Sequence, residues 1–105
     1  QANTNNYEKP DEASLAQNYP NPFNPVTKIE FQLPMDAIVT IKVYDILGRE
    51  IVKLAENQEF SLGTNVLEFN GSTLPAGVYF YNIIVHDIDT NELLFQTTRK
   101  MILNK

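Results

Sequence analysis

Apolar and polar side chains alternate along much of this chain, and the alternation constrains the fold more than any other feature. From Lys28 to Leu33 every second residue is apolar, and the same pattern returns from Val39 to Tyr44. Because successive side chains of a strand point to opposite faces, such runs predict strands with one face in a core and one in solvent. No segment has a convincing helical period. We therefore predict an all-β fold.

Further strands are predicted on both sides of these two runs. The run from Glu50 to Leu54 alternates less cleanly, as edge strands often do. The other predicted strands are Leu15 to Asn18, Val66 to Phe69, Val78 to Ile88 and Leu93 to Leu103. Six or seven short strands separated by turn signals predict an antiparallel β-sandwich of about seven strands.

The connections carry the residues that tight turns prefer. Asp45 and Gly48 occupy the first and last positions of a predicted type I turn, in which the Asp side chain accepts nearby backbone N–H groups. The segment from Leu74 to Gly77, with proline in second place, predicts another turn. The pair Asn70-Gly71 is a two-residue signal for backbone with positive φ. Hairpin connections are therefore expected.

The chain divides into a polar segment and one domain. Residues 1–14 are polar and are predicted to be a flexible linker, followed by a domain over residues 15–105. Three prolines fall within residues 18–25. Since proline restricts φ and lacks an N–H, this stretch is predicted to be extended or turning backbone that lies against a sheet.

Charge and composition exclude several classes of function. The net charge of -5 argues against a nucleic-acid binder, because phosphate contacts need clustered Lys and Arg. The chain has no cysteine, so a disulfide framework and a thiolate metal site are excluded. No run of 18 apolar residues occurs, so no direct membrane insertion is expected. We interpret the chain as a module cut from a longer protein, with any export signal lost upstream.

The sequence gives little support for catalysis. The one histidine, His86, lies inside a predicted strand, where a structural role is far more common than general-base chemistry. None of the three serines lies in a Gly-x-Ser-x-Gly motif. We expect no enzyme, no catalytic residue and no cofactor.

Two other motifs have simpler explanations as turns. Asp87, Asp89 and Asn91 resemble the first half of a calcium loop, but Glu92 replaces the required glycine and Thr98 the closing glutamate. A polar hairpin is favoured, and a weak surface calcium near Asp87 and Asp89 stays open. The sequon at residues 70–72 is explained equally well by a tight turn.

The tyrosines and phenylalanines suggest packing roles. Tyr79 follows a Leu-Pro-x-Gly corner at the start of a long strand, where sandwich folds place a tyrosine whose hydroxyl bonds to upstream backbone. Exposed aromatic side chains on one face would instead indicate carbohydrate binding. With no tryptophan in the chain, most aromatic residues are expected to fill the core.

Several motifs occur together in an order typical of one family. The matching segments are residues 18–25 (NYPNPFNP), 43–49 (VYDILGR), 70–71 (NG), 74–81 (LPAGVYFY) and 100–105 (KMILNK). From about Leu15 to its end, the chain resembles the C-terminal sorting domain of type IX secretion substrates. The resemblance is to the branch that is similar to the immunoglobulin-like domain of flagellar hook-capping proteins. It implies an immunoglobulin-like antiparallel β-sandwich.

This resemblance also implies a non-catalytic sorting signal. In that family the domain ends a secreted cargo protein, is recognised by the outer-membrane translocon, and is commonly removed by a sortase-like peptidase that attaches the cargo to the cell surface. The implied partners are therefore the translocon, the peptidase and an N-terminal cargo domain of the same precursor. The implied location is the cell surface or the exterior, after passage through the periplasm.

The end of the sequence is the predicted recognition element. It concentrates three of the eight Lys and Arg residues of the chain within seven positions, and a partner could add a strand beside it. The predicted recognition residues are Arg99, Lys100, Met101, Ile102, Leu103, Asn104 and Lys105. An equally good explanation is that basic residues on an edge strand prevent aggregation.

The remaining motif residues are predicted to be scaffold. Turn and corner roles explain all of them: Asn21, Pro22, Asp45, Gly48, Arg49, Gly77 and Tyr79. Two alternatives to the sorting role stay open. One is an accessory immunoglobulin-like spacer of an extracellular enzyme, and the other is a carbohydrate-binding module.

Overall fold

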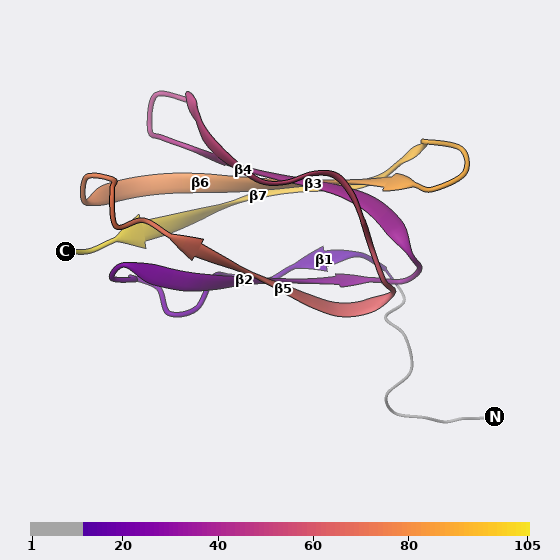
Figure 1. Cartoon of the computed structure of the whole chain (residues 1–105), viewed down its shortest axis with the longest axis horizontal. Helices are drawn as coiled ribbons and strands as arrows, with labels where there is room; N and C mark the ends of the chain where they lie inside the picture. The colour runs from indigo at the N-terminus through magenta and orange to yellow at the C-terminus, as the bar shows by residue number, and fades with distance from the viewer. Residues whose placement is uncertain (1–11) are drawn as a thin grey trace.

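The computed structural model describes residues 12–105 as seven strands in two layers (Figure 1). The strands are β1 (Ser14–Leu15), β2 (Val26–Leu33), β3 (Ala37–Tyr44), β4 (Glu50–Phe60), β5 (Gly63–Asn70), β6 (Gly77–Asp87) and β7 (Leu93–Leu103). No helix occurs in this part of the chain. The prediction of an all-β sandwich of about seven strands is confirmed.

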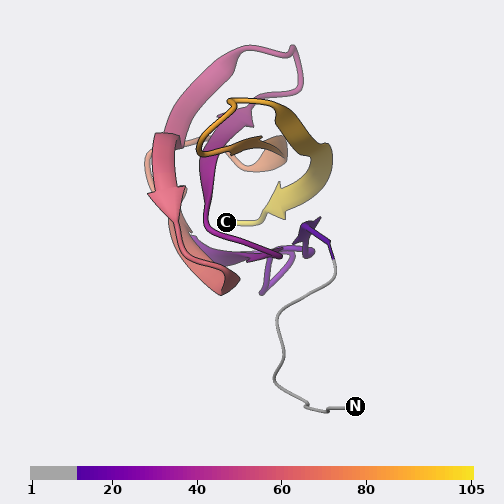
Figure 2. The same ribbon diagram turned by 90° about the vertical axis from the view of Figure 1, so that its right-hand side faces the viewer.

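Each layer is an antiparallel sheet. One has the strand order β1-β2-β5, and the other has the order β4-β3-β6-β7. The fourth strand therefore pairs with the third strand instead of with the fifth, which distinguishes this order from that of an immunoglobulin constant domain. Figure 2 shows the chain crossing from one layer to the other, along the side of the sandwich, as it runs from β4 to β5.

Residues that alternate inward from both sheets form a single core. It contains Leu15, Phe23, Ile29, Phe31, Leu33, Val39, Ile41, Val43, Phe69, Tyr79, Tyr81, Ile83, Val85, Met101 and Leu103, among others. Each strand that showed clean alternation in the sequence contributes every second residue. Burying one such aliphatic or aromatic side chain is worth about 1.5–3 kcal/mol, so the alternation itself determines which face of each strand points inward.

Strand β4 is longer than the sequence predicts. It runs to Phe60 instead of Leu54, and most side chains between Glu56 and Glu59 are exposed. Its pairing with β3 contains register shifts, and Asn57 has a positive φ of 46°. Because a bulged edge strand is exposed on much of its surface, the periodic signal disappears although the pairing continues.

The predicted tyrosine corner is confirmed. The Tyr79 hydroxyl donates a hydrogen bond to the carbonyl oxygen of Pro75 at 2.6 Å. A second tyrosine with a structural hydroxyl, Tyr81, was not anticipated. Its hydroxyl donates to the carbonyl oxygen of Ala16 at 2.8 Å and accepts the N–H of Asn18 at 2.7 Å. Tyr81 thereby ties the second sheet to the chain that follows β1.

The prediction of positive φ at Asn70-Gly71 is wrong. Neither residue has a positive φ, and the segment carries the chain from one sheet to the other instead of closing a hairpin. Gly71 is required for a different reason. A Cβ atom there would lie 3.1 Å from Cδ2 of Leu103 and 3.4 Å from Cε2 of Phe23, both buried.

The predicted linker, residues 1–14, lies mostly outside the described residues. Of its last three residues, Ala13 is buried and Ser14 pairs with Gln32. The division between linker and domain stays a prediction, with contacts of the domain beginning at Ala13.

We expect Tyr81→Phe to lower the free energy of unfolding by about 1–3 kcal/mol, because it leaves the buried N–H of Asn18 without its acceptor. Tyr79→Phe should cost less, about 0.5–1.5 kcal/mol, since it removes a single bond to an exposed residue. Urea denaturation of the two variants measures both values. Equal stability of Tyr81→Phe and the wild type would contradict this account.

We expect Gly71→Ala to destabilise the domain by about 1–3 kcal/mol, because the added methyl group overpacks the core against Leu103 and Phe23. Ser72→Ala is the matched control. Its side chain is exposed, so its effect should stay within about 0.5 kcal/mol. Thermal unfolding of the pair tests the difference, and a neutral Gly71→Ala would show that the neighbouring side chains yield easily.

Candidate functional site

The predicted recognition residues alternate between the core and the surface. Met101 and Leu103 are buried at 0% and 1% exposure, whereas the side chains of Lys100 and Ile102 point outward. Arg99 is also exposed, and its Nε donates to the carbonyl oxygen of Leu15 at 2.6 Å. The end of β7 is therefore both a core strand and a surface, and a partner can contact only the outward half of it.

The outer edge of this strand end is already occupied. A segment that we call the strap, residues 17–23, runs beside it in parallel. The N–H of Phe23 donates to the carbonyl oxygen of Ile102 at 2.9 Å, and the N–H of Asn104 donates to the carbonyl oxygen of Phe23 at 2.8 Å. The Asn21 side chain accepts the N–H of Ile102 at 3.0 Å. The strap therefore covers this edge, and pairing with a partner strand stays a prediction that requires the strap to detach.

The strap has its own buried polar support in Asn18. Its Nδ2 donates to Thr27 Oγ1 at 3.0 Å and to the carbonyl oxygen of Pro20 at 3.2 Å. The Thr27 hydroxyl also donates to Pro20 at 2.9 Å. Asn18 and Thr27 are both almost fully buried. These bonds position the proline-rich backbone, and sequence reasoning assigned no role to either residue.

The predicted turn between β3 and β4 is confirmed. The N–H of Gly48 donates to the carbonyl oxygen of Asp45 at 3.0 Å, and Gly48 has a φ of 83° that favours glycine. Asp45 Oδ1 accepts the N–H groups of Leu47 and Arg49, each at 2.9 Å, while Oδ2 accepts Arg49 Nε at 2.7 Å. The bonds from Arg49 and Leu47 lower the pKa of the Asp45 carboxyl.

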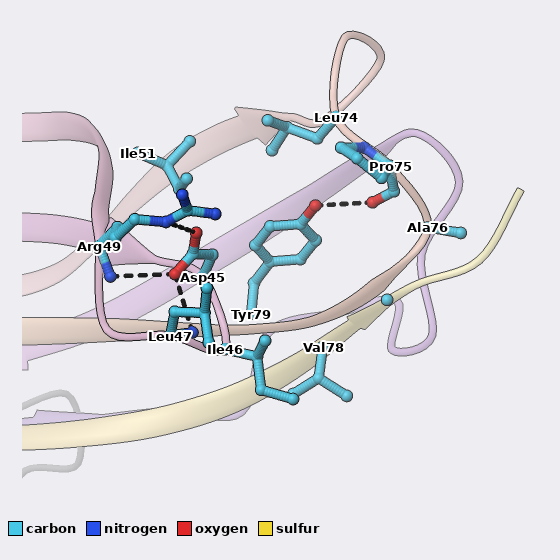
Figure 3. A pocket seen from close by; sticks show the side chains of 11 residues that line it. Asp45, Ile46, Leu47, Arg49, Ile51, Leu74, Pro75, Ala76, Val78 and Tyr79 are labelled. Carbon is cyan, nitrogen blue, oxygen red and sulfur yellow. Dashed lines mark hydrogen bonds and ion pairs between the residues drawn. The ribbon is translucent and has the colours of Figure 1, made fainter.

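A hollow of about 410 Å³ lies between this turn and the tyrosine corner (Figure 3). Its walls are mainly apolar and come from Ile46, Leu47, Ile51, Leu74, Pro75 and Val78, with Tyr79 and Arg49 also lining it. Ile46 and Leu47 are 70% and 73% exposed. These two neighbouring side chains and the apolar walls of the hollow form one exposed apolar surface, a feature of interaction sites.

The hollow is continuous with the outward side of the terminal strand. Val78 lines the hollow and is the register partner of Ile102, which is 37% exposed. We call this surface the basal patch. It consists of the apolar residues Ile46, Leu47, Val78 and Ile102 with the cations Arg49 and Lys100. The sequence showed these residues in separate motifs, and only the strand pairing brings them together.

The predicted scaffold residues gather at this same end of the sandwich. Asn21 and Pro22 lie in the strap, Asp45, Gly48 and Arg49 form the turn, and Gly77 and Tyr79 open β6. Scaffold contacts are clear for Asn21, Asp45 and Tyr79. Arg49 joins the scaffold through its backbone N–H and its Nε, which both donate to the Asp45 carboxylate, and its side chain is 73% exposed beside the hollow.

Opposite ends of the molecule differ in charge. At the end that holds the basal patch, four cations accompany three carboxylates: Lys28, Arg49, Lys100 and Lys105 with Asp45, Glu50 and Glu68. At the other end, the strand ends and connections of the described chain carry carboxylates without Lys or Arg: Glu12, Asp36, Glu59, Asp87, Asp89 and Glu92. The charge is thus polarised along the strands.

The other residues that the sequence singled out, His86 and the acidic residues after it, lie in a strand and in the turn that follows it. His86 is half-buried within β6. Asp87 Oδ1 accepts the N–H groups of Thr90 and Asp89 at 2.9 and 2.8 Å, and these bonds lower its pKa. Residues 12–105 contain no cluster of three His, Cys, Asp or Glu that could hold a metal. Within the same range we find no helix with the length and apolar character needed to cross a membrane.

The chain was compared with models of known protein families, and one model matches most of it. The family model for the secretion system C-terminal sorting domain matches residues 17–104. The matched segment includes the strap, the β3–β4 turn, the tyrosine corner and the terminal strand. No curated protein matches the chain. The chain therefore belongs to the type IX secretion C-terminal sorting domain family, whose members mark proteins for export to the cell surface or for secretion.

Proposed function

We propose that this domain is a non-catalytic sorting signal, and that the outer-membrane translocon of the type IX system recognises it at the basal patch. The cargo is joined on the N-terminal side of the domain. After export, a sortase-like peptidase cuts within the predicted linker, residues 1–14, and releases or anchors the cargo. The observation that carries the proposal is the gathering of all the family motifs at one end of the sandwich, around an exposed apolar surface.

The arrangement of the chain ends supports this proposal. Glu12 and Ala13 line a small hollow with Met35 and Leu94, at the end of the sandwich opposite to Leu103. Figure 1 shows the described chain starting beside the β2–β3 connection, with its last residue at the far end of the strands. A cargo joined before Glu12 would leave the basal patch open to a partner.

The strap determines how the terminal strand would be recognised. The backbone N–H of Ile102 donates to the Asn21 side chain, and its carbonyl oxygen accepts the N–H of Phe23. Adding a partner strand would first require the strap to detach. We therefore place recognition on outward side chains, with Lys100 and Ile102 as the contacts from β7.

Export of a reporter protein fused before residue 1 tests the proposal in a host with a type IX system. Lys100→Glu and Ile102→Ser should each reduce export, because they alter the surface without entering the core. Both exposed substitutions should change stability by no more than about 0.5 kcal/mol. Deleting residues 102–105 is a poorer test, since it also removes the buried Leu103.

Ile88→Ser is the matched control, because Ile88 is 40% exposed at the opposite end. It should be exported as well as the wild type. If the unaltered fusion stays inside the cell, the sorting role is wrong and an accessory spacer module becomes the better explanation.

We also expect Asn21→Ala to loosen the strap locally. Hydrogen exchange at the Ile102 amide should become faster, since its acceptor on Asn21 is removed, while Ile83 at the centre of β6 stays protected. If the translocon recognises outward side chains of β7, export of the reporter fusion that carries Asn21→Ala should not increase. Increased export of this variant would favour strand addition at the exposed edge instead.

A further inference from the structure

We propose that the β3–β4 turn and its hollow are a second contact for the secretion machinery, which receives a protein loop carrying one apolar side chain and one carboxylate. The apolar side chain enters the hollow between Leu47 and Pro75, and the carboxylate pairs with Arg49. This inference rests on the proposed sorting role and deepens it. It assigns an occupant to one part of the basal patch, the turn and its hollow, in addition to the contacts proposed for Lys100 and Ile102 on β7.

The exposure of Ile46 and Leu47 is the first support. Both side chains are at least 70% exposed, although the turn needs only Asp45 and Gly48 to form. A polar residue at either position would satisfy the same backbone. A contiguous exposed apolar surface that adjoins a hollow is a feature of protein interaction sites.

The geometry of Arg49 is the second support. Asp45 holds the guanidinium through Nε at 2.7 Å, which orients its plane next to the hollow (Figure 3). No other hydrogen bond from this guanidinium occurs within residues 12–105. An arginine held through one nitrogen still presents donors in a rigid fork, and this fork matches a carboxylate. Less side-chain entropy is lost on binding because Asp45 already orders the group.

The distribution of charge favours an acidic partner. Within residues 12–105, the end that holds the turn has more cations than carboxylates, whereas the opposite end has carboxylates without Lys or Arg. A partner with a negative potential would attract the first end and repel the second, which orients the domain during the encounter. The turn thus supplies both an apolar anchor site and a cation for the same loop.

The proposal is tested with the purified chain carrying a fluorescent reporter, and with outer-membrane vesicles from a host that has the type IX translocon. Vesicles from the same host without the translocon are the reference. Leu47→Ser, Ile46→Ser and Arg49→Gln should each weaken binding to the first vesicles by about tenfold, as truncation of a central contact does. Higher salt should weaken wild-type binding more than binding of Arg49→Gln.

Leu93→Ser is the matched control, because Leu93 is 52% exposed and lies at the opposite end. It should bind like the wild type. Thermal midpoints near the wild-type value show that the variants fold. Arg49→Lys retains the charge but not the fork, so intermediate binding supports recognition of a carboxylate by the guanidinium.

Two results would overturn the inference. Wild-type binding by Leu47→Ser and Ile46→Ser would show that the hollow is not occupied. Equal binding of the wild type to both kinds of vesicle would identify lipid or saccharide as the target instead of a protein. In either case export of the unaltered reporter fusion still decides the sorting role separately, so failure of the turn contact does not count against that role.

Discussion

The pairing of Phe23 with the end of β7 is the contact on which the rest of this structure depends. Phe23 bonds to Ile102 and Asn104 through its backbone, and its ring lies buried 5.9 Å from that of Phe69. One residue therefore joins the strap, the last strand and the opposite sheet. Gly71 has no side chain because Phe23 and Leu103 fill the adjoining space. The close approach of these segments explains why a proline-rich stretch and a distant glycine occur in one motif set.

Buried polar groups make that arrangement specific. Burying an amide or a hydroxyl is costly unless it finds a partner, and Asn18, Thr27 and Tyr81 satisfy one another and the surrounding backbone. A hydrophobic core alone would tolerate small shifts of the strap. A network in which each donor has one acceptor does not, since a shift would leave several groups without partners.

Sequence reasoning predicted the parts of the fold in which periodicity and burial agree. The inward face of β2 follows from alternation, the bounds of β7 agree with the predicted strand, and the Tyr79 bond follows from the corner motif. The full length of β4 escaped because its exposed, bulged half has no period. Gly71 was misread because a tight turn and a close approach call for the same residue. The basal patch could not be predicted, since Ile46 and Ile102 become neighbours of Val78 only through strand pairing.

The alternation of Met101 and Leu103 with Lys100 and Ile102 has a consequence for quality control. The outward pair is displayed on one side only when the inward pair is seated between the sheets, because both sets belong to the same extended backbone. An unfolded or damaged domain would contain the same residues, but they would not form this surface. Under the proposed function, the translocon would therefore bind only domains that have folded. Precursors with an unfolded domain would stay in the periplasm.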